Sequence, residues 1–498
     1  MSSLLDGDSS ALADTVRRCA EVSVLIVGDL MLDEYVGGTV ERISPEAPVP
    51  IVRAGTSEFR LGGAANVARQ IAALGAKATL IGVVGDDAAG ETVRRLCQES
   101  NISTEFIVPV RHRQTTRKLR VLSQSQQLLR IDWEDSQPLP GEAADALIDK
   151  ISRSSPADAI ILSDYAKGVL SAPVISEVMH KRHPRTRTVV VDPKHRDFTR
   201  YRGANVLTPN LRELGDAVGR LLDPADITAV AIAARSQIEA GGFDGLVVTL
   251  GDRGILIAMA AGSQRLIPAL KRPVYDVTGA GDTAAAVLTT CLAAGATIAS
   301  AAHIANAAAG IAVGEIGAVA VPSSRIVDLV TGRPPSKVMS REKLQRCVKQ
   351  WRDAGQRIVF TNGCFDLLHP GHLSLLHYAK SLGDILVLAI NSDAAVRRLK
   401  GPSRPVLSQD DRAGMLGALG CVDAVTIFDE DTPLETVRCV QPEILVKGQD
   451  YRLEEVVGRD VVEAAGGSVV LAPLLAHYST TSLLMRARAK AGDTANGF

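Results

Sequence analysis

The sequence predicts an α/β protein of two domains: a parallel-sheet domain with a β lid, followed by a smaller Rossmann-like α/β domain. Apolar segments alternate with helical segments from Ile160 onward, and such alternation gives parallel strands covered by helices on both faces. The glycine- and proline-rich segment 332–336 interrupts any element and marks a boundary. At 498 residues the chain is too long for one core. We therefore expect domains at 1–331 and 341–498, joined by a linker at 332–340.

The first domain begins with an apolar segment, Val22 to Val27, that reads as a buried strand ending at Gly28-Asp29. Residues 31–59 are irregular and predict a small sheet or lid, and paired glycines then open a helix over 67–74. The alternation of polar and apolar residues in 116–132 predicts a hairpin that could cover a site. Four further strands are expected, each followed by polar residues: 160–162, 188–191, 206–208 and 245–250.

The segment V-T-G-A-G-D-T at 277–283 predicts an anion-binding loop at a helix N-terminus, where bare amides and the helix dipole favour negative charge. Asp282 is placed where it could accept a proton from an attacking hydroxyl. Taken alone, the segment fits a glycine-rich turn capped by Asp equally well. The residues behind it, 283–314, read as two helices with a turn near Gly295.

The second domain begins with a predicted helix over 341–353, capped by Ser340, and a strand over 357–360. The segment T-N-G-C-F-D-L-L-H-P-G-H at 361–372 then opens a helix, with Pro370 in its first turn. Two histidines at a helix mouth suggest imidazoles that donate to phosphate oxygens, although either one alone would more often be a core residue. A further strand at 386–390 precedes an expected cationic loop formed by Arg397, Arg398, Lys400 and Arg404, for which a solvated face is the usual reading.

Composition excludes several classes of function. A net charge of -1 and 3% aromatic residues give no reason to expect nucleic acid as a partner. The seven cysteines are scattered and never spaced C-x-x-C, which fits a reducing cytoplasm. Segment 283–314 carries no charged side chain but is built from small residues and not from Leu, Ile and Phe, so we expect no membrane association.

Four motifs in order, at 62–66, 210–213, 249–254 and 279–282, resemble the ribokinase family of sugar kinases over residues 21–321. The resemblance implies an ATP-dependent kinase with Asp282 as general base and the amides of Gly279, Ala280 and Gly281 as its anion hole. Segment 210–213 could also be a plain Asn-capped helix start. The implied ATP-binding residues are Asn210, Leu211, Arg212, Glu213 (also an indirect metal contact), Thr249, Gly251, Gly254 and Asn306. The implied sugar-binding residues are Asp29, Gly62, Gly63 and Asn66.

Residues 358–485 resemble the cytidylyltransferase-like nucleotidyltransferases. The resemblance implies that a substrate phosphate attacks the α-phosphorus of a nucleoside triphosphate and releases pyrophosphate. His369 and His372 would stabilise the reacting phosphorus. The other implied nucleotide-binding residues are Thr361, Asn362, Gly363, Phe365, Asp393, Lys400, Arg412, Ser479, Thr480 and Thr481.

The order kinase first, nucleotidyltransferase second resembles a family of bacterial enzymes that act on heptose phosphates. It implies phosphorylation of heptose 7-phosphate at O1 and adenylyl transfer to heptose 1-phosphate. It also implies Mg²⁺ with ATP in both domains, a monovalent cation in the kinase domain, and a homodimer formed through that domain. Two alternatives stay open: a different sugar kinase joined to a CTP-dependent cytidylyltransferase, or one inactive half that serves as a binding or dimerisation module.

Overall fold

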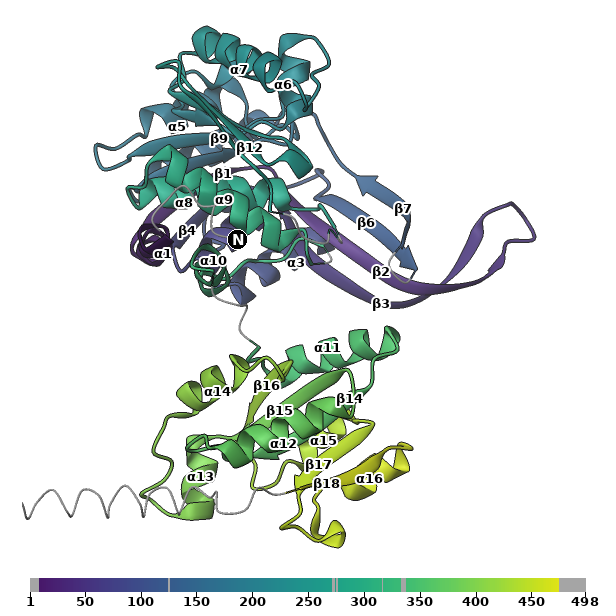
Figure 1. The fold of residues 1–498 in the computed structure, drawn as a ribbon. Helices are drawn as coiled ribbons and strands as arrows, with labels where there is room; N and C mark the ends of the chain where they lie inside the picture. The colour runs from purple at the N-terminus through teal and green to yellow at the C-terminus, as the bar shows by residue number, and fades with distance from the viewer. Residues whose placement is uncertain are drawn as a thin grey trace, which may run out of the picture. The chain divides into compact units, whose positions relative to one another are not determined.

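The computed structural model of the chain describes residues 9–123, 126–270, 274, 276–315, 317–332 and 337–473. Its contacts divide the chain into two compact units, Met1–Arg333 and Pro334–Phe498. Each unit is an α/β layer structure, in agreement with the predicted fold class (Figure 1).

The first unit contains a nine-stranded sheet in the order β13-β12-β11-β10-β9-β8-β1-β4-β5. All neighbouring strands from β11 to β5 are parallel, and the two edge pairs that involve β12 are antiparallel. In sheet order the strands are Gln264–Ile267, Ile255–Met259, Gly245–Thr249, Val206–Leu207, Thr188–Asp192, Ala159–Ser163, Ser23–Gly28, Lys77–Gly85 and Ile107–Val110.

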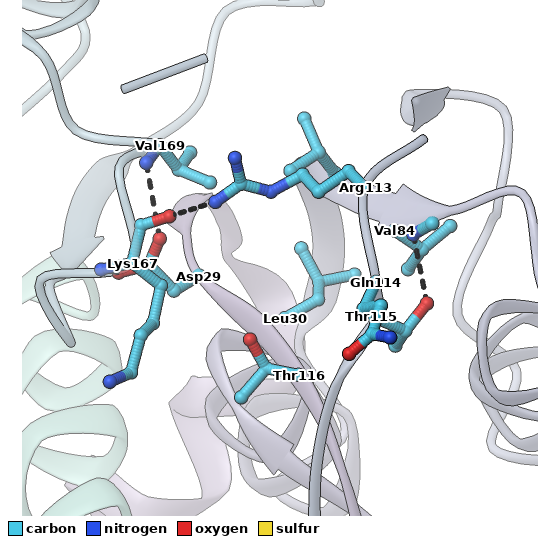
Figure 2. Close-up of a pocket in the computed structure, with 11 residues that line it drawn as sticks. Asp29, Leu30, Val84, Arg113, Gln114, Thr115, Thr116, Lys167 and Val169 are labelled. Atoms are coloured by element: carbon cyan, nitrogen blue, oxygen red, sulfur yellow. Dashed lines mark hydrogen bonds between the residues drawn. The ribbon is translucent and has the colours of Figure 1, made fainter. Parts of the chain in front are cut away.

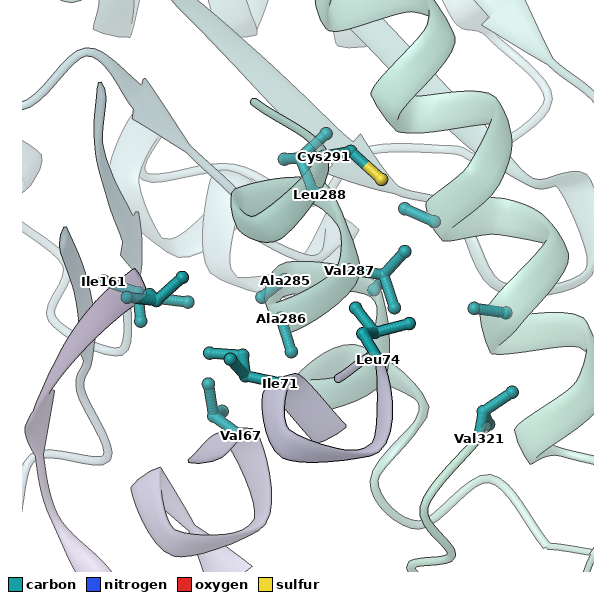
Figure 3. Close-up of a cluster of buried hydrophobic side chains, with 14 of the residues drawn as sticks. Val67, Ile71, Leu74, Ile161, Ala285, Ala286, Val287, Leu288, Cys291 and Val321 are labelled. Atoms are coloured by element: carbon teal, nitrogen blue, oxygen red, sulfur yellow. The ribbon is translucent and has the colours of Figure 1, made fainter. Parts of the chain in front are cut away.

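Helices cover both faces of this sheet because its central strands are apolar on both sides. Along β1, Val24 and Ile26 belong to one core cluster, whereas Leu25 and Val27 belong to the other. One face is covered by α1 (Ser9–Arg18), α2 (Ala64–Ala73), α3 (Ala88–Glu99), α8 (Ala280–Ala293), α9 (Ile298–Ala312) and α10 (Ser323–Val330). The other carries α4 (Gly141–Arg153), α5 (Ala172–His180), α6 (Leu211–Val218) and α7 (Ile227–Gly241). Figure 3 shows α2 and α8 packing through Val67, Ile71, Ala286 and Val287.

The lid is a separate four-stranded sheet in the order β3-β2-β6-β7. The predicted hairpin is confirmed as β6 (Thr116–Ser123) and β7 (Gln126–Trp133). The segment expected to form a small sheet or lid consists of two long antiparallel strands, β2 (Leu30–Ile43) and β3 (Pro50–Gly63), and its irregular composition does not prevent their pairing. Two of its prolines lie in the turn that joins them and the third begins β3, so they do not interrupt the pairing.

The long uncharged segment forms α8 and α9, with Gly295 between them at φ +84°, as predicted. Within the described residues, no helix is long and apolar enough to cross a membrane.

The second unit contains a five-stranded parallel sheet in the order β16-β15-β14-β17-β18. In sheet order its strands are Ala424–Phe428, Ile385–Asn391, Ile358–Gly363, Ile444–Gly448 and Ser468–Ala472. Its helices are α11 (Arg341–Asp353), α12 (Pro370–Ser381), α13 (Asp393–Lys400), α14 (Gln409–Gly417), α15 (Leu434–Val440) and α16 (Arg459–Ala464). Four short 3₁₀ turns complete the described chain: Cys19–Glu21, Phe198–Tyr201, Gly251–Arg253 and Leu453–Glu455.

Candidate active sites

The loop before α8 has the geometry of an anion-binding helix N-terminus. Gly279 adopts φ +77°, and its carbonyl oxygen accepts hydrogen bonds from the amide (2.9 Å) and the hydroxyl (2.8 Å) of Thr283. The Ala280 amide, expected in the anion hole, donates instead to the Val277 carbonyl oxygen at 3.3 Å. In the described part of the chain, the amides of Gly279, Gly281 and Asp282 have no acceptor. These three N–H groups are therefore free to bind an anion.

Asp282 lies in the first turn of α8 and is almost fully buried. Its Oδ2 accepts a hydrogen bond from Asn66 Nδ2 at 2.7 Å, and its Oδ1 accepts one from the hydroxyl of Tyr165. Arg69 donates to the Asn66 Oδ1 at 2.8 Å, which orients the amide so that its nitrogen faces the carboxylate. Asn66 therefore contacts the candidate base in this structure.

Burial raises the pKa of the Asp282 carboxyl group, and the hydrogen bonds from Asn66 and Tyr165 lower it by less. A carboxylate with a raised pKa accepts a proton more readily than a solvated one. The contacts of Asp282 therefore fit a general base better than a simple helix cap.

Asp29, one of the expected sugar-binding residues, is held in place by the backbone of a neighbouring loop. Its two carboxylate oxygens accept hydrogen bonds from the amides of Tyr165 (2.8 Å), Lys167 (3.1 Å) and Val169 (3.2 Å). Figure 2 shows Asp29 beneath this loop, with Arg113 donating to the Lys167 carbonyl oxygen from the other side of a small pocket. Asp29 thus holds the loop that brings the Tyr165 hydroxyl to Asp282.

The sequence analysis missed Asp33, which lies on β2 within the same buried cluster of charges. Arg120 donates to its Oδ1 at 2.6 Å, and its negative charge contributes to the raised pKa of Asp282. A Cβ atom at Gly62 would lie only 2.7 Å from Asp33 Oδ2, so the glycine is needed for this close approach. Asp33 lies within the segment predicted to form a small sheet or lid, but the sequence does not indicate that Arg120 is its partner.

The expected ATP side of the kinase site is built on the start of α6. Asn210 and Glu213 form a capping box, with both hydrogen bonds at 2.9 Å, so the plain helix-start interpretation describes their local geometry. Glu213 also pairs with Lys194 at 2.8 Å. Leu211 is half-buried in the first turn, and Arg212 is exposed.

Four more expected nucleotide residues differ in how they are placed. Gly251 adopts φ +62° with open space beside it, and Thr249 is half-buried at the end of β11. By contrast, a Cβ atom at Gly254 would lie 2.0 Å from the Ile267 carbonyl oxygen, so this glycine serves the chain's own packing. Asn306 donates to the Pro268 carbonyl oxygen at 2.8 Å.

The carboxylates of Asp192, Glu213 and Asp282 influence one another, but in the described part of the chain they do not form a complete metal site. Burial raises the pKa of Asp192 well above its usual value, and the negative charges of Glu213 and Asp282 add to this effect. Within the described residues, no group of three or more His, Cys, Asp or Glu side chains could hold a metal ion. Mg²⁺ often binds through one or two carboxylates, water and substrate phosphates, and these residues fit that mode.

In the second unit, the two predicted histidines meet at the start of α12. His369 is the N-cap residue, and its Nδ1 accepts a hydrogen bond from the His372 amide at 3.3 Å. The imidazole rings stack with centroids 3.7 Å apart, and Phe365, at φ +46°, packs against His372 at 4.9 Å. Because Nδ1 of His369 is an acceptor, its proton lies on Nε2, where it could be donated to a phosphate.

Burial and, to a smaller extent, the neighbouring His369 and Lys400 lower the pKa of His372 to about 4. Burial also lowers the pKa of His369. Both rings are therefore neutral at pH 7 in the absence of nucleotide, and they act as N–H donors.

Of the remaining expected transferase residues, some form hydrogen bonds within the protein and others are partly or fully exposed to solvent. Arg412 is fully buried and donates to Asp393 Oδ1 at 2.8 Å and to the Cys364 carbonyl oxygen at 2.6 Å. The Thr361 hydroxyl donates to the Val446 carbonyl oxygen at 2.9 Å. Asn362 and Gly363 are half-buried at the end of β14, and Lys400 is exposed. Ser479, Thr480 and Thr481 lie outside the described residues.

The expected cationic loop is wrong in its first part. Arg397, Arg398 and Lys400 belong to α13, which begins after Ser392, whose side chain caps the helix. Cations in the last turn of a helix are stabilised by the helix dipole. The run of positive charges therefore marks the end of a helix and not a loop. Arg404 follows the helix and pairs with the buried carboxylate of Asp366 at 2.7 Å.

The fold and the two sites define a sugar kinase joined to a nucleotidyltransferase. Residues 22–325 match the family described as pfkB family carbohydrate kinase, and residues 360–482 match the cytidylyltransferase-like family. Phosphofructokinase-2 from Escherichia coli in complex with substrates and products has the same fold, with a TM-score of 0.53 and 21% identity. That alignment covers 62% of this chain and 99% of the phosphofructokinase chain.

Two curated relatives extend the match to both halves. The bifunctional protein HldE of Paramagnetospirillum magneticum is 46% identical over 96% of this chain and 98% of the relative. The bifunctional protein HldE of Rhodospirillum rubrum is 46% identical over 97% of this chain and 99% of the relative. The chain belongs to the family of bifunctional HldE proteins, and it is both a kinase and a nucleotidyltransferase.

Proposed function

We propose that the chain carries out two steps of ADP-heptose biosynthesis. The first unit transfers the γ-phosphoryl group of ATP to O1 of heptose 7-phosphate. The second unit transfers the adenylyl group of ATP to heptose 1-phosphate and releases pyrophosphate. One observation supports this most strongly: a buried carboxylate at a free helix N-terminus and a stacked histidine pair occur in one chain that matches HldE proteins over nearly its full length.

In the kinase step, the Asp282 carboxylate takes the proton of the sugar O1 hydroxyl as the oxygen attacks the γ-phosphorus. The amides of Gly279, Gly281 and Asp282 donate to the negative charge that develops on the transferred group. Asn66 and Tyr165 hold the carboxylate in place. Asp29, Gly62, Gly63 and Asn66 form the sugar side of the site, with Asp33 beside Gly62. Asp29 also holds the loop that carries Tyr165.

In the transferase step, an oxygen of the sugar 1-phosphate attacks the α-phosphorus of ATP and the pyrophosphate leaves. His369 and His372 donate hydrogen bonds to the phosphate oxygens as negative charge accumulates, and Lys400 adds positive charge beside His372. Arg412 positions Asp393 and the Cys364 backbone from inside the domain.

Both families use ATP with Mg²⁺, which when bound neutralises phosphate charge. We assign Glu213 an indirect contact to this ion in the kinase half. A monovalent cation in the kinase half is tested by assaying with K⁺ and with tetramethylammonium. If the cation binds there, the kinase rate falls in tetramethylammonium, and an unchanged rate rejects that site.

We also propose that the chain forms a homodimer through the lid of the kinase unit. The lid exposes apolar side chains that a monomer would leave in water: Val40, Ile43, Val49, Phe59, Leu129 and Ile131. Sedimentation of the whole chain should give twice the monomer mass, and Ile43→Asp with Leu129→Asp should give the monomer. A wild-type monomer at micromolar concentration would contradict this assignment.

Mass spectrometry of the products tests the proposed function. Heptose 7-phosphate with ATP should give heptose 1,7-bisphosphate, and heptose 1-phosphate with ATP should give ADP-heptose. Formation of CDP-heptose in preference to ADP-heptose would favour the cytidylyltransferase alternative. No turnover in one half would favour a binding or dimerisation module.

A further inference from the structure

Lys447 lies at a position in the transferase unit where ligands of such sheets bind. It is the fourth residue of β17 (Ile444–Gly448), which runs parallel to β14. The chain crosses from β14 to β15 on one side and later returns to β17 on the other, so the strand order reverses between β14 and β17. The carboxyl ends of the strands at such a reversal form a ligand-binding crevice.

The ammonium group of Lys447 has little compensation from the protein. It is 9% exposed, and its Nζ donates to the Asn362 carbonyl oxygen at 3.1 Å. Within the described residues no carboxylate pairs with it at ion-pair distance, although its charge lies 5.1 Å from the centre of the Tyr451 ring. Beside it, the buried Asn362 Oδ1 has no hydrogen-bond partner in the described part of the chain. A buried cation of this kind is costly unless an anion completes its contacts.

Burial lowers the pKa of Lys447 to about 8, and the charges of Asp450 and Cys364 oppose this change. The ammonium contacts the Asn362 carbonyl oxygen and lies over the Tyr451 ring, and the charges of Asp450 and Cys364 act on it. Lys447 is charged at pH 7 and loses its proton just above the physiological range.

We propose that Lys447 binds the phosphate group of the sugar 1-phosphate acceptor and so presents it to the α-phosphorus. The proposal rests on the transferase function assigned above. Lys400 is the cation whose charge acts on His372, whereas the Lys447 ammonium contacts the Asn362 carbonyl oxygen near the end of β14. The two reactants are both anionic, so a separate cation for the acceptor reduces their repulsion as they approach.

Steady-state kinetics of Lys447→Met with ATP and with heptose 1-phosphate as the varied substrate test the proposal. Loss of the charged hydrogen bond should raise KM for heptose 1-phosphate by about tenfold to a hundredfold, while KM for ATP stays within about twofold. Lys447→Arg should recover part of the loss, because it restores a cation. Lys349→Met removes an exposed lysine from α11 and should leave both values unchanged.

The pH dependence provides a second readout. For the wild type, KM for heptose 1-phosphate should rise as pH increases through about 8, because the ammonium loses its proton. Lys447→Arg should lack this rise, because arginine stays protonated. A change in KM for ATP alone, or an unchanged KM for heptose 1-phosphate in Lys447→Met, overturns the proposal. Absence of turnover in the wild type would instead reject the transferase function itself.

Discussion

Tyr165 and Asn66 together influence the pKa and the orientation of Asp282, the candidate base of the kinase site. Each donates to a different oxygen of the buried Asp282 carboxylate, and each hydrogen bond stabilises the charged form. Burial acts in the opposite direction and is the larger effect. The base therefore combines a raised pKa with a fixed orientation.

Replacing Tyr165 by Phe should shift the acid limb of the kinase pH profile to higher pH. The substitution removes a hydrogen bond that lowers the pKa of Asp282, so that pKa rises further and the carboxylate is protonated over a wider range. The kinase rate should fall at pH 6 by more than it falls at pH 8, measured as kcat with saturating substrates. An acid limb that does not move would show that the hydroxyl has no part in setting the base.

For single residues, the sequence indicated which side chains are candidates for catalysis, but it did not indicate which residues they contact. Asp282 and the two histidines were recognised because a glycine turn or a proline-started helix precedes them. The Asp393 partner of Arg412, the Arg120 partner of Asp33 and the Tyr165 partner of Asp29 lie 19, 87 and 136 positions away along the chain. Local pattern carries no information about such partners.

Among the elements, the buried strands and the capped helices were predicted well. The helix Arg341–Asp353 begins at its Ser340 cap as expected, because that cap is a local hydrogen bond to the Lys343 amide. The lid was predicted, but the length of β2 and β3 was not, because these strands carry bulges and mixed polarity and are stabilised by pairing with each other. The helix α13 differs from the predicted cationic loop, because a run of positive charges is compatible both with a solvated loop and with the last turn of a helix.

The hairpin of β12 and β13 depends on Gly254. Its backbone has φ +100°, and a Cβ atom there would meet the Ile267 carbonyl oxygen at 2.0 Å. Gly254→Ala should lower the free energy of unfolding of the kinase unit by about 3 kcal/mol or more, measured by urea denaturation. Gly262→Ala is the matched control, since φ is +87° there but no atom lies within 4 Å, and it should cost about 1 kcal/mol. Equal losses for the two variants would reject the packing explanation.

The loop before α12 and the start of α13 are joined by Arg412 from α14. Arg412→Met should destabilise the transferase unit by about 2–3 kcal/mol, because it leaves the Cys364 carbonyl oxygen and the Asp393 carboxylate without their donor. Asp393 remains partly exposed, which limits the loss. Arg438→Met removes an exposed pair with Glu435 and should change stability by less than about 0.5 kcal/mol. Similar effects of both substitutions in thermal unfolding would contradict this role.

For the whole molecule, the central observation is that each unit contains its own core and its own reactive groups. The kinase unit holds Asp282 on α8, in the helical layer on one face of its sheet, and the transferase unit holds the histidine pair at the start of α12, beside a separate sheet.

The most direct test of this account measures both activities in two single variants of the whole chain. Asp282→Asn should lower the kinase rate by about a thousandfold or more and leave adenylyl transfer to heptose 1-phosphate unchanged. His372→Ala should do the reverse. Loss of both activities from either substitution, in protein that remains folded, would contradict two independent catalytic sites.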